Sequence, residues 1–417
     1  MSDINEKLAV LVTIAENSAS VEECERSLDE LERLLNTAGG TCFAKIIQVK
    51  EKFDPRTCIG KGKVTEISEL CKANDIELVI FDFELSPAQI RNLENDIGDV
   101  TVIDRSMLIL DIFALHAVSG EGKLQVELAQ LRYTAPRLTG RGIELSRQGG
   151  GIGSRGPGES KLETDRRHLH EKIVSLEKRL NEMERNRFVM RAQRDRSGLM
   201  KVALVGYTNA GKSTLMNSLT NADVIAEDKL FATLDPTTRK LDLPCGESVL
   251  LTDTVGFIRK LPHHLVKAFK STLDEVLYAD VLLIVSDVND PEVSEHLTVT
   301  KAVIADLGAS DKPVIYVYNK CDLSEEASDV APSDNVVCLS AKTGKGVDAL
   351  LEMIEAELHR KKKECRLVIP YTNQSVLNLI YKSYTVISLE YLENGVEVKV
   401  ILDAKGRGQY AEYLSEV

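Results

Sequence analysis

The chain has 417 residues, of which 28% are charged and 43% hydrophobic, and its formal net charge at pH 7 is −13. This composition is typical of a globular protein, and the length indicates two to three domains. The negative charge argues against a protein drawn to RNA or to anionic membranes over its whole surface. We find no apolar stretch long enough to span a membrane, no signal peptide at the start and no CxxC pair among the eight cysteines. We therefore expect a cytoplasmic protein with reduced thiols and without a disulfide scaffold or a zinc site.

The first 105 residues predict an α/β domain with a parallel sheet. Short apolar runs alternate with helical stretches, which is the pattern of β-α-β units. We expect strands at 8–14, 43–49, 77–82 and 100–103, and helices at about 21–37, 61–73 and 86–96. No GxGxxG follows the first strand, so a dinucleotide site is not indicated. The segment 52–64, with close glycines and four cations, would suit a phosphate, but a plain turn explains it better.

Two long helices are predicted next, within residues 106–199. The first spans about 106–136 and the second about 159–197, and in each the apolar residues recur at a spacing of four and three. In the first helix they are Leu110, Ala114, Ala117, Leu124, Leu128, Leu131 and Ala135, with an interruption at Glu121. In the second they are Leu162, Leu169, Ile173, Leu176, Leu180, Met183 and Met190, with Arg166 and Arg187 in the stripe. A stripe this narrow is typical of a coiled-coil seam, so we expect an antiparallel hairpin around a loop at 138–158.

The loop of this hairpin has an unusual composition. Residues 140–158 hold eight of the chain's 26 glycines, with Arg141, Arg147 and Arg155 between them. Glycine permits close backbone approach at a cost in conformational entropy, and arginine pairs with phosphate and stacks on bases. From Leu131 to Met200 sixteen Lys and Arg stand against nine Asp and Glu, opposite in sign to the whole chain. We expect these three arginines to contact RNA; the alternatives are a flexible tether and a solvated helix face rich in salt bridges.

A phosphate-binding loop is predicted directly after the hairpin. The buried strand 201–205 runs into GYTNAGKST at 206–214, which is GxxxxGK[ST] between a strand and a helix. Backbone N–H groups of such a loop, with the N-terminus of the following helix, hold the β-phosphate. Lys212 is placed for the β- and γ-phosphates, and the Ser213 hydroxyl is placed for Mg²⁺.

The strand at 248–252 ends in a DxxG motif that predicts a γ-phosphate sensor. Asp253 is placed to hold Mg²⁺ through water, and the Gly256 N–H is placed to contact the γ-phosphate. Contacts of this type order switch loops, and hydrolysis releases them.

The segment FATLDPTTR at 231–239 is predicted to complete the Mg²⁺ shell when GTP is bound. A threonine would supply the ligand, and we expect Thr233. Thr237 and Thr238 are competing candidates.

Two later motifs predict recognition of guanine. The strand at 314–318 runs into NKCD, where the Asp322 carboxylate can accept hydrogen bonds from guanine N1–H and N2–H₂. Adenine lacks that donor pair, so Asp322 favours GTP over ATP. The loop at 340–342 follows a strand at 336–339 and resembles the loop that backs the base.

Together the motifs predict one GTP site. In the phosphate loop the expected contacts are Gly206, Tyr207, Thr208, Asn209, Ala210, Gly211, Lys212, Ser213 and Thr214. In the next two segments they are Phe231, Ala232, Thr233, Leu234, Asp235, Asp253, Thr254, Val255 and Gly256. Around the base they are Asn319, Lys320, Asp322, Ser340, Ala341 and Lys342. Ser213 and Thr233 are the expected direct ligands of Mg²⁺.

Two departures bear on hydrolysis. Phe257 stands just after DxxG, where many GTPases place a glutamine that orients water. A phenyl ring cannot do this, so we expect slow intrinsic hydrolysis and assign no catalytic residue. Asn209 stands where some GTPases use asparagine to help coordinate K⁺ in place of an arginine finger; the alternative is that it only stabilises the loop. Arg259, Lys260, His263 and His264 are near enough in sequence to contribute, but the sequence assigns none of them a catalytic role.

The last residues, 364–417, predict a small α+β domain. VLNLIYK is expected to form a helix, and TVISLEYL and GVEVKVIL are expected to form strands. The basic run HRKKK at 359–363 is expected to close the preceding helix, where cations suit the helix dipole.

With these motifs the sequence resembles the HflX family of translation-factor-class GTPases along essentially its whole length. Outside the GTPase motifs the resemblance rests on IGKGK (59–63), ELSPAQIRNLE (84–94), VIDRSMLILDIFALHA (102–117), KLQVELAQLRYTAPRL (123–138), SRQGGGIGSRGPGESKLETDRR (146–167) and FATLDPTTR (231–239). Cys58 stands where an aromatic residue is common in the family. The resemblance implies a GTPase that binds the large ribosomal subunit, reaches rRNA near the peptidyl-transferase centre with its hairpin loop, and splits stalled or idle ribosomes under stress.

We therefore expect an α/β protein in four parts. They are an N-terminal domain (1–105), the helical hairpin (106–199), a Ras-like P-loop GTPase domain (200–363) and a small α+β domain (364–417). We expect a monomeric GTP hydrolase that uses Mg²⁺, and K⁺ if Asn209 coordinates it, and that the large ribosomal subunit stimulates. One alternative is an RNA-remodelling protein whose nucleotide is a conformational clamp. Another is a regulatory GTPase that binds a protein partner through the hairpin.

Overall fold

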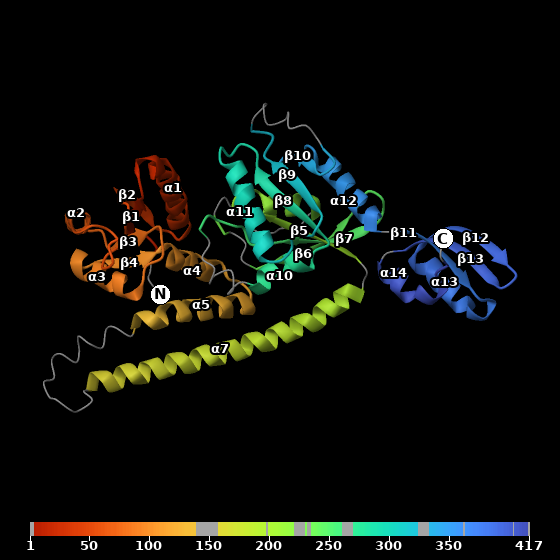
Figure 1. The fold of residues 1–417 in the computed structure, drawn as a ribbon, viewed down its shortest axis with the longest axis horizontal. Helices are drawn as coiled ribbons and strands as arrows, with labels where there is room; N and C mark the ends of the chain where they lie inside the picture. The colour runs from red at the N-terminus through yellow and green to blue at the C-terminus, as the bar shows by residue number, and fades with distance from the viewer. Residues whose placement is uncertain are drawn as a thin grey trace.

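A computed structural model describes most of the chain and is built around three sheets (Figure 1). The described residues are 4–138, 157–196, 199–220, 230–231, 235–260, 270–323, 333–361, 363–402 and 404–415. The predicted α/β class is confirmed, with a four-stranded parallel sheet followed by a six-stranded, mainly parallel sheet. None of the described helices is long and apolar enough to cross a membrane.

The N-terminal sheet has the strand order β2-β1-β3-β4, and all of its strands are parallel. Its elements are β1 (Leu8–Ala15), α1 (Val21–Thr37), β2 (Thr41–Val49), α2 (Lys61–Ala73), β3 (Leu78–Phe81), α3 (Pro87–Ile97) and β4 (Thr101–Asp104). They confirm the predicted strands and helices to within two residues at each end. The strands β1 and β3 are almost wholly buried because α2 and α3 cover one face of the sheet while α1 covers the other.

The prediction of one helix over about 106–136 is wrong. The structure divides this segment into α4 (Arg105–His116) and α5 (Gly120–Leu138). The side chain of Asp104 caps α4, and α4 then packs its apolar residues under the N-terminal sheet. Leu110 and Ala117, predicted for the seam, lie in that core instead. The 4-3 spacing continues across the bend between α4 and α5 because both helices bury apolar residues. Those of α4 pack on the N-terminal sheet, and those of α5 pack on the second helix of the hairpin.

The hairpin itself consists of α5 and the long helix α7 (Pro157–Arg196), which lie alongside each other (Figure 1). Its seam holds Leu124, Leu128 and Leu176, with Leu131, Ile173, Leu180 and Met183 partly buried around them. The ion pairs Glu121–Arg187 and Arg132–Glu177 run in opposite order along the two helices, so the hairpin is antiparallel as predicted. Two of the three charged residues in the predicted stripes, Glu121 and Arg187, are thus partners.

The central sheet has the order β10-β9-β8-β5-β7-β6, with only β6 antiparallel among these strands. Its strands are β5 (Met200–Gly206), β6 (Thr237–Asp242), β7 (Ser248–Asp253), β8 (Val281–Asp287), β9 (Val314–Asn319) and β10 (Val336–Cys338). The helices α8 (Lys212–Thr220) and α12 (Val347–Lys361) pack on one face, and α10 (Lys270–Tyr278) and α11 (Val293–Asp306) pack on the other. Ligands of such sheets bind beyond the carboxyl ends of the parallel strands.

The C-terminal sheet is antiparallel, with the order β11-β13-β12. Its elements are β11 (Lys363–Ile369), α13 (Gln374–Ser383), β12 (Thr385–Leu392), β13 (Gly395–Leu402) and α14 (Ala404–Gln409). The predicted helix and two strands are confirmed. The strand β11 was not predicted, and it includes Lys363 of the basic run that was expected to close the helix before it.

Candidate nucleotide site

The predicted phosphate loop connects β5 to α8 at the carboxyl edge of the central sheet. Gly206 and Gly211 have φ angles of +146° and +90°, which side chains rarely adopt. A Cβ at Gly206 would collide with the Val285 carbonyl, and one at Gly211 would collide with the Asn319 amide. The sequence needs glycine at both positions because the loop passes so close to the neighbouring strands.

Lys212 is folded back over this loop. Its ammonium group donates hydrogen bonds to the carbonyls of Gly206 (3.2 Å) and Tyr207 (2.8 Å), and the side chain is buried. Burial lowers the pKa of Lys212 to about 8, although the Asp253 carboxylate nearby favours the charged form. An anion in the loop would stabilise the same charged form.

The two predicted metal residues that the structure describes lie together. The Ser213 hydroxyl donates to Asp253 Oδ2 at 2.6 Å, and Asp253 is fully buried at the end of β7. The next residue, Thr254, donates to the Leu204 carbonyl at 2.6 Å and so fixes the end of β7 against β5. A hydroxyl and a carboxylate are oxygen donors of the kind that Mg²⁺ prefers, so this pair fits the ion.

The third predicted metal residue, Thr233, lies outside the described residues, as do Ala232 and Leu234. Its two competitors begin strand β6, where the hydroxyls of Thr238 and Thr252 share a hydrogen bond of 3.0 Å. Arg141, Arg147 and Arg155 also lie outside the described residues.

The DxxG segment packs directly on the phosphate loop. The Phe257 N–H donates to the Gly206 carbonyl (3.0 Å), and the Thr208 N–H donates to the Phe257 carbonyl (2.8 Å). A Cβ at Gly256 would lie only 2.8 Å from Thr208 Cα and 3.0 Å from Lys212 Nζ. Phe257 is 1% exposed, so its ring packs in the core and cannot orient a water molecule.

The predicted base-recognition residues meet at the ends of β9 and β10. The Asn319 side chain donates to the Ala210 carbonyl (2.9 Å) and accepts from the Ala341 N–H (2.9 Å), which ties the phosphate loop to the 340–342 loop. Lys320 pairs with Asp287 at 2.8 Å. The hydrogen bond from Ser340 lowers the pKa of Asp322, so this exposed carboxylate is held in its charged, accepting form.

A buried polar cluster joins this site to the N-terminal domain, and no sequence motif predicted it. The Tyr207 hydroxyl donates to Glu30 of α1 and accepts from the Arg259 N–H at 2.7 Å. The Tyr207 ring stacks on His296 with centroids 3.7 Å apart. Burial and the adjacent Glu30 carboxylate raise the pKa of Tyr207, so it stays a hydrogen-bond donor.

The residue next to Arg259 continues this cluster. Lys260 donates to Asp82 at 2.7 Å and to Ser27 at 2.9 Å, and Arg105 donates to the other oxygen of Asp82 at 2.6 Å. Asp82 is fully buried and is paired with both of these cations. The partners are 23 and 178 residues away in sequence, which is why no local pattern could reveal them.

Two residues predicted to contact GTP, Phe231 and Asp235, lie against the two helices on either side of the bend between α4 and α5. The Phe231 ring packs edge-on against Phe113 of α4, with centroids 4.7 Å apart. The Asp235 carboxylate accepts hydrogen bonds from the N–H groups of Val118 and Ser119.

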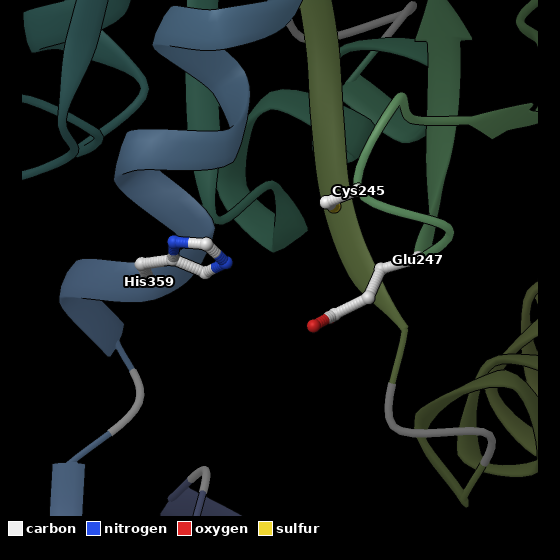
Figure 2. A group of neighbouring side chains, drawn as sticks. All are labelled: Cys245, Glu247 and His359. Carbon is white, nitrogen blue, oxygen red and sulfur yellow. The ribbon is translucent and has the colours of Figure 1, made fainter. Parts of the chain in front are cut away.

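One group of side chains outside this site has the donor types of a metal ligand set. Cys245 and Glu247 on the β6–β7 turn and His359 on α12 place their ligand atoms within 4.8 Å of one another (Figure 2). Cys245 and His359 are exposed. The β6–β7 turn precedes β7, whereas the phosphate loop lies at the carboxyl ends of the strands, so this group cannot serve the metal of a bound nucleotide.

The phosphate loop, the DxxG segment and the NKxD segment thus converge at one edge of a mainly parallel sheet, which defines a P-loop GTPase. Four family models match: "GTP-binding GTPase N-terminal" (residues 25–114), "GTP-binding GTPase Middle Region" (116–194), "50S ribosome-binding GTPase" (201–320) and "HflX C-terminal domain" (325–413).

Similar proteins give the particular family. The GTPase HflX of Lacrimispora saccharolytica is 48% identical over 97% of this chain and 95% of its own. The GTPase HflX of Caldanaerobacter subterraneus is 50% identical over 94% of this chain and 90% of its own. The GTPase HflX of Escherichia coli is 46% identical over 82% of this chain and 82% of its own. The chain belongs to the HflX family, and it is a GTP hydrolase.

Proposed function

We propose that this GTPase binds the large ribosomal subunit in the cytoplasm and uses GTP-dependent switching to dissociate stalled or idle ribosomes under stress. The match of residues 201–320 to a family described as ribosome-binding supports the partner. The structural observation that supports GTP-dependent switching is the buried cluster. In it, Tyr207 of the phosphate loop and Lys260 after DxxG both bind the N-terminal domain, from which the hairpin extends.

In this proposal the phosphate loop, residues 206–214, cradles the phosphates of GTP. Asn319 and Asp322 recognise guanine, and the 340–342 loop backs the base. Ser213 and Thr233 ligate Mg²⁺, with Asp253 acting through water; the ion neutralises charge on the phosphates when it is bound. The support is the convergence of Lys212, Ser213 and Asp253 at the strand ends.

The hairpin delivers the arginine-rich loop to RNA. The seam of α5 and α7 gives the stalk its stiffness, and the loop between them carries Arg141, Arg147 and Arg155. Guanidinium groups suit phosphate and base stacking, and the glycines around them permit close backbone approach. The bound factor is a monomer whose GTPase domain stays attached to the base of the hairpin.

Hydrolysis is slow in the free protein and is stimulated by the large subunit. The buried Phe257 ring supplies no group that could orient water, so an outside activator is required. Asn209, exposed and with a φ of +62°, is the candidate for coordinating K⁺ beside the phosphates.

GTP turnover with and without purified large subunits tests the proposal. Strong stimulation, together with co-sedimentation of the protein with the subunits, is the expected result. Unchanged turnover and no co-sedimentation would rule the ribosomal function out. Stimulation by unrelated structured RNA to the same extent would favour instead an RNA-remodelling protein that uses nucleotide as a clamp.

A further inference from the structure

The bend between α4 and α5 is held by a carboxylate from the GTPase domain. Asp235 Oδ2 accepts hydrogen bonds from the backbone N–H groups of Val118 (3.0 Å) and Ser119 (2.7 Å), and Asp235 Oδ1 accepts from the Ser119 hydroxyl. These residues are more than a hundred positions apart in sequence. A single side chain therefore binds the point at which the hairpin leaves the N-terminal domain.

This contact completes the N-terminal cap of α5. The Ser119 hydroxyl accepts a hydrogen bond from the Gly122 N–H at 2.8 Å, and the Ser119 carbonyl accepts from the Lys123 N–H at 3.0 Å. Asp235 orients that hydroxyl and places a negative charge at the positive end of the helix dipole. The first helix of the hairpin is thus capped jointly by its own serine and by another domain.

Of the two glycines in the first turn of α5, only Gly122 lies close to Asp235. A Cβ at Gly122 would lie 2.6 Å from Asp235 Oδ1 and 3.1 Å from Ser119 Oγ. A Cβ at Gly120, in the same helical turn, would meet nothing within 4 Å. The two glycines offer a matched pair of substitutions, one that disturbs the cap and one that does not.

The segment that carries Asp235 also contacts the other side of the bend. Phe231 is 2% exposed and packs edge-on against Phe113 of α4, while Asp235 binds the start of α5. Thr233, the residue proposed to ligate Mg²⁺, stands two positions from each of these contacts. Two residues span at most about 7 Å, so ligation of Mg²⁺ by Thr233 would limit how far Phe231 and Asp235 can lie from the ion.

We propose that Asp235 is a positioning residue that couples the nucleotide state to the base of the hairpin through the cap of α5. The inference rests on the proposed GTP-dependent switching and adds the contact that connects it to the hairpin. Coupling of this kind is reciprocal, so nucleotide must alter the strength of the cap, and breaking the cap must alter the preference between GTP and GDP by the same factor.

Hydrogen exchange of the full chain tests this. The amides of Val118, Ser119 and Gly122 are followed with saturating GDP and with a non-hydrolysable GTP analogue, and binding of each nucleotide is measured in parallel. We expect exchange to differ about fivefold between the two nucleotides, the effect of making or losing one cap. Gly122→Ala should remove that difference and shift the ratio of the two affinities by a similar factor, although alanine is the better helix former. Gly120→Ala should leave both unchanged.

The outcomes separate this inference from the proposed function. If the analogue does not bind, the GTP switch itself fails and the coupling falls with it. If the analogue binds but exchange at these amides is the same with both nucleotides, the coupling alone is wrong. It is equally wrong if Gly122→Ala keeps the full nucleotide dependence. Asp235→Asn provides a second variant with the same readouts should Gly122→Ala fold poorly, and it too must lose the nucleotide dependence.

Discussion

The interface between the N-terminal and GTPase domains and the seam of the hairpin are both buried, but they differ in the kinds of side chain that they bury. The interface contains buried charges and a tyrosine, with Asp82 holding both Arg105 and Lys260, beside the apolar contact of Phe113 with Phe231. Leucines such as Leu176 make the seam, with ion pairs only beside it. Hydrogen-bonded charges have discrete partners that can be exchanged, whereas closely packed apolar side chains resist deformation. The interface is suited to sensing a nucleotide, and the seam is suited to carrying a tip without bending.

The largest expected effect on stability comes from removing the central carboxylate of the buried charge cluster. Asp82→Ala leaves the Arg105 guanidinium, 2% exposed, with one carboxylate in place of two. Because an undercompensated buried charge is costly, we expect a loss of about 3 kcal/mol in the free energy of unfolding, measured by denaturant titration. Asp99→Ala, at an exposed position, is the control. Equal stabilities of the two variants would contradict the role given to the cluster.

The seam should respond more weakly and only locally. Leu176→Ala removes a side chain that is 4% exposed between the two helices, so we expect a cost of about 2 kcal/mol to the hairpin. Hydrogen exchange across α5 and α7 measures it, with Val174→Ala, 50% exposed, as the control. Affinity for GDP should not change; a change would show that the seam and the nucleotide site are not separate as described.

A single hydroxyl in the interface should matter less still. Tyr207→Phe keeps the stack on His296 but removes the group that links Glu30 to the Arg259 N–H. We expect a loss of about 1–2 kcal/mol in the free energy of unfolding, because the buried Glu30 carboxylate loses one of its donors. Tyr391→Phe, at a position 75% exposed, should have no effect in the same denaturant titration. If both variants behave alike, the hydroxyl is not a structural link.

The smallest expected effect is a dependence on pH. Burial lowers the pKa of His296 below 6.5, although the Asp290 carboxylate opposes this. The unfolded chain then binds a proton more readily than the folded one, so this contribution to stability is present above pH 6.5 and is lost as the pH falls below it. His296→Phe keeps a ring against Tyr207. It should reduce the fall in melting temperature that we expect between about pH 7.5 and about pH 5.5. His168→Phe, on the exposed face of α7, should not; identical profiles would refute the assignment.

The sequence predicted what is local and missed what is distant. The strands and helices of the N-terminal sheet and the phosphate loop follow from hydrophobic period and from glycines that one turn requires, so they could be located to within two residues. The bend at 117–119 was missed because apolar spacing continues across it, while the carboxylate that binds it, Asp235, comes from another domain. The Glu30 and Asp82 contacts were missed for the same reason, since their partners in the GTPase domain lie 177 and 178 residues away.

The most direct test of the account compares subunit-stimulated GTP turnover in the natural chain and in the double variant Arg147→Ala, Arg155→Ala. If the hairpin tip binds ribosomal RNA and its base reports to the nucleotide site, the variant loses most of the stimulation and its binding loses salt dependence, while turnover without subunits is unchanged. Full stimulation of the variant by large subunits would contradict the central claim.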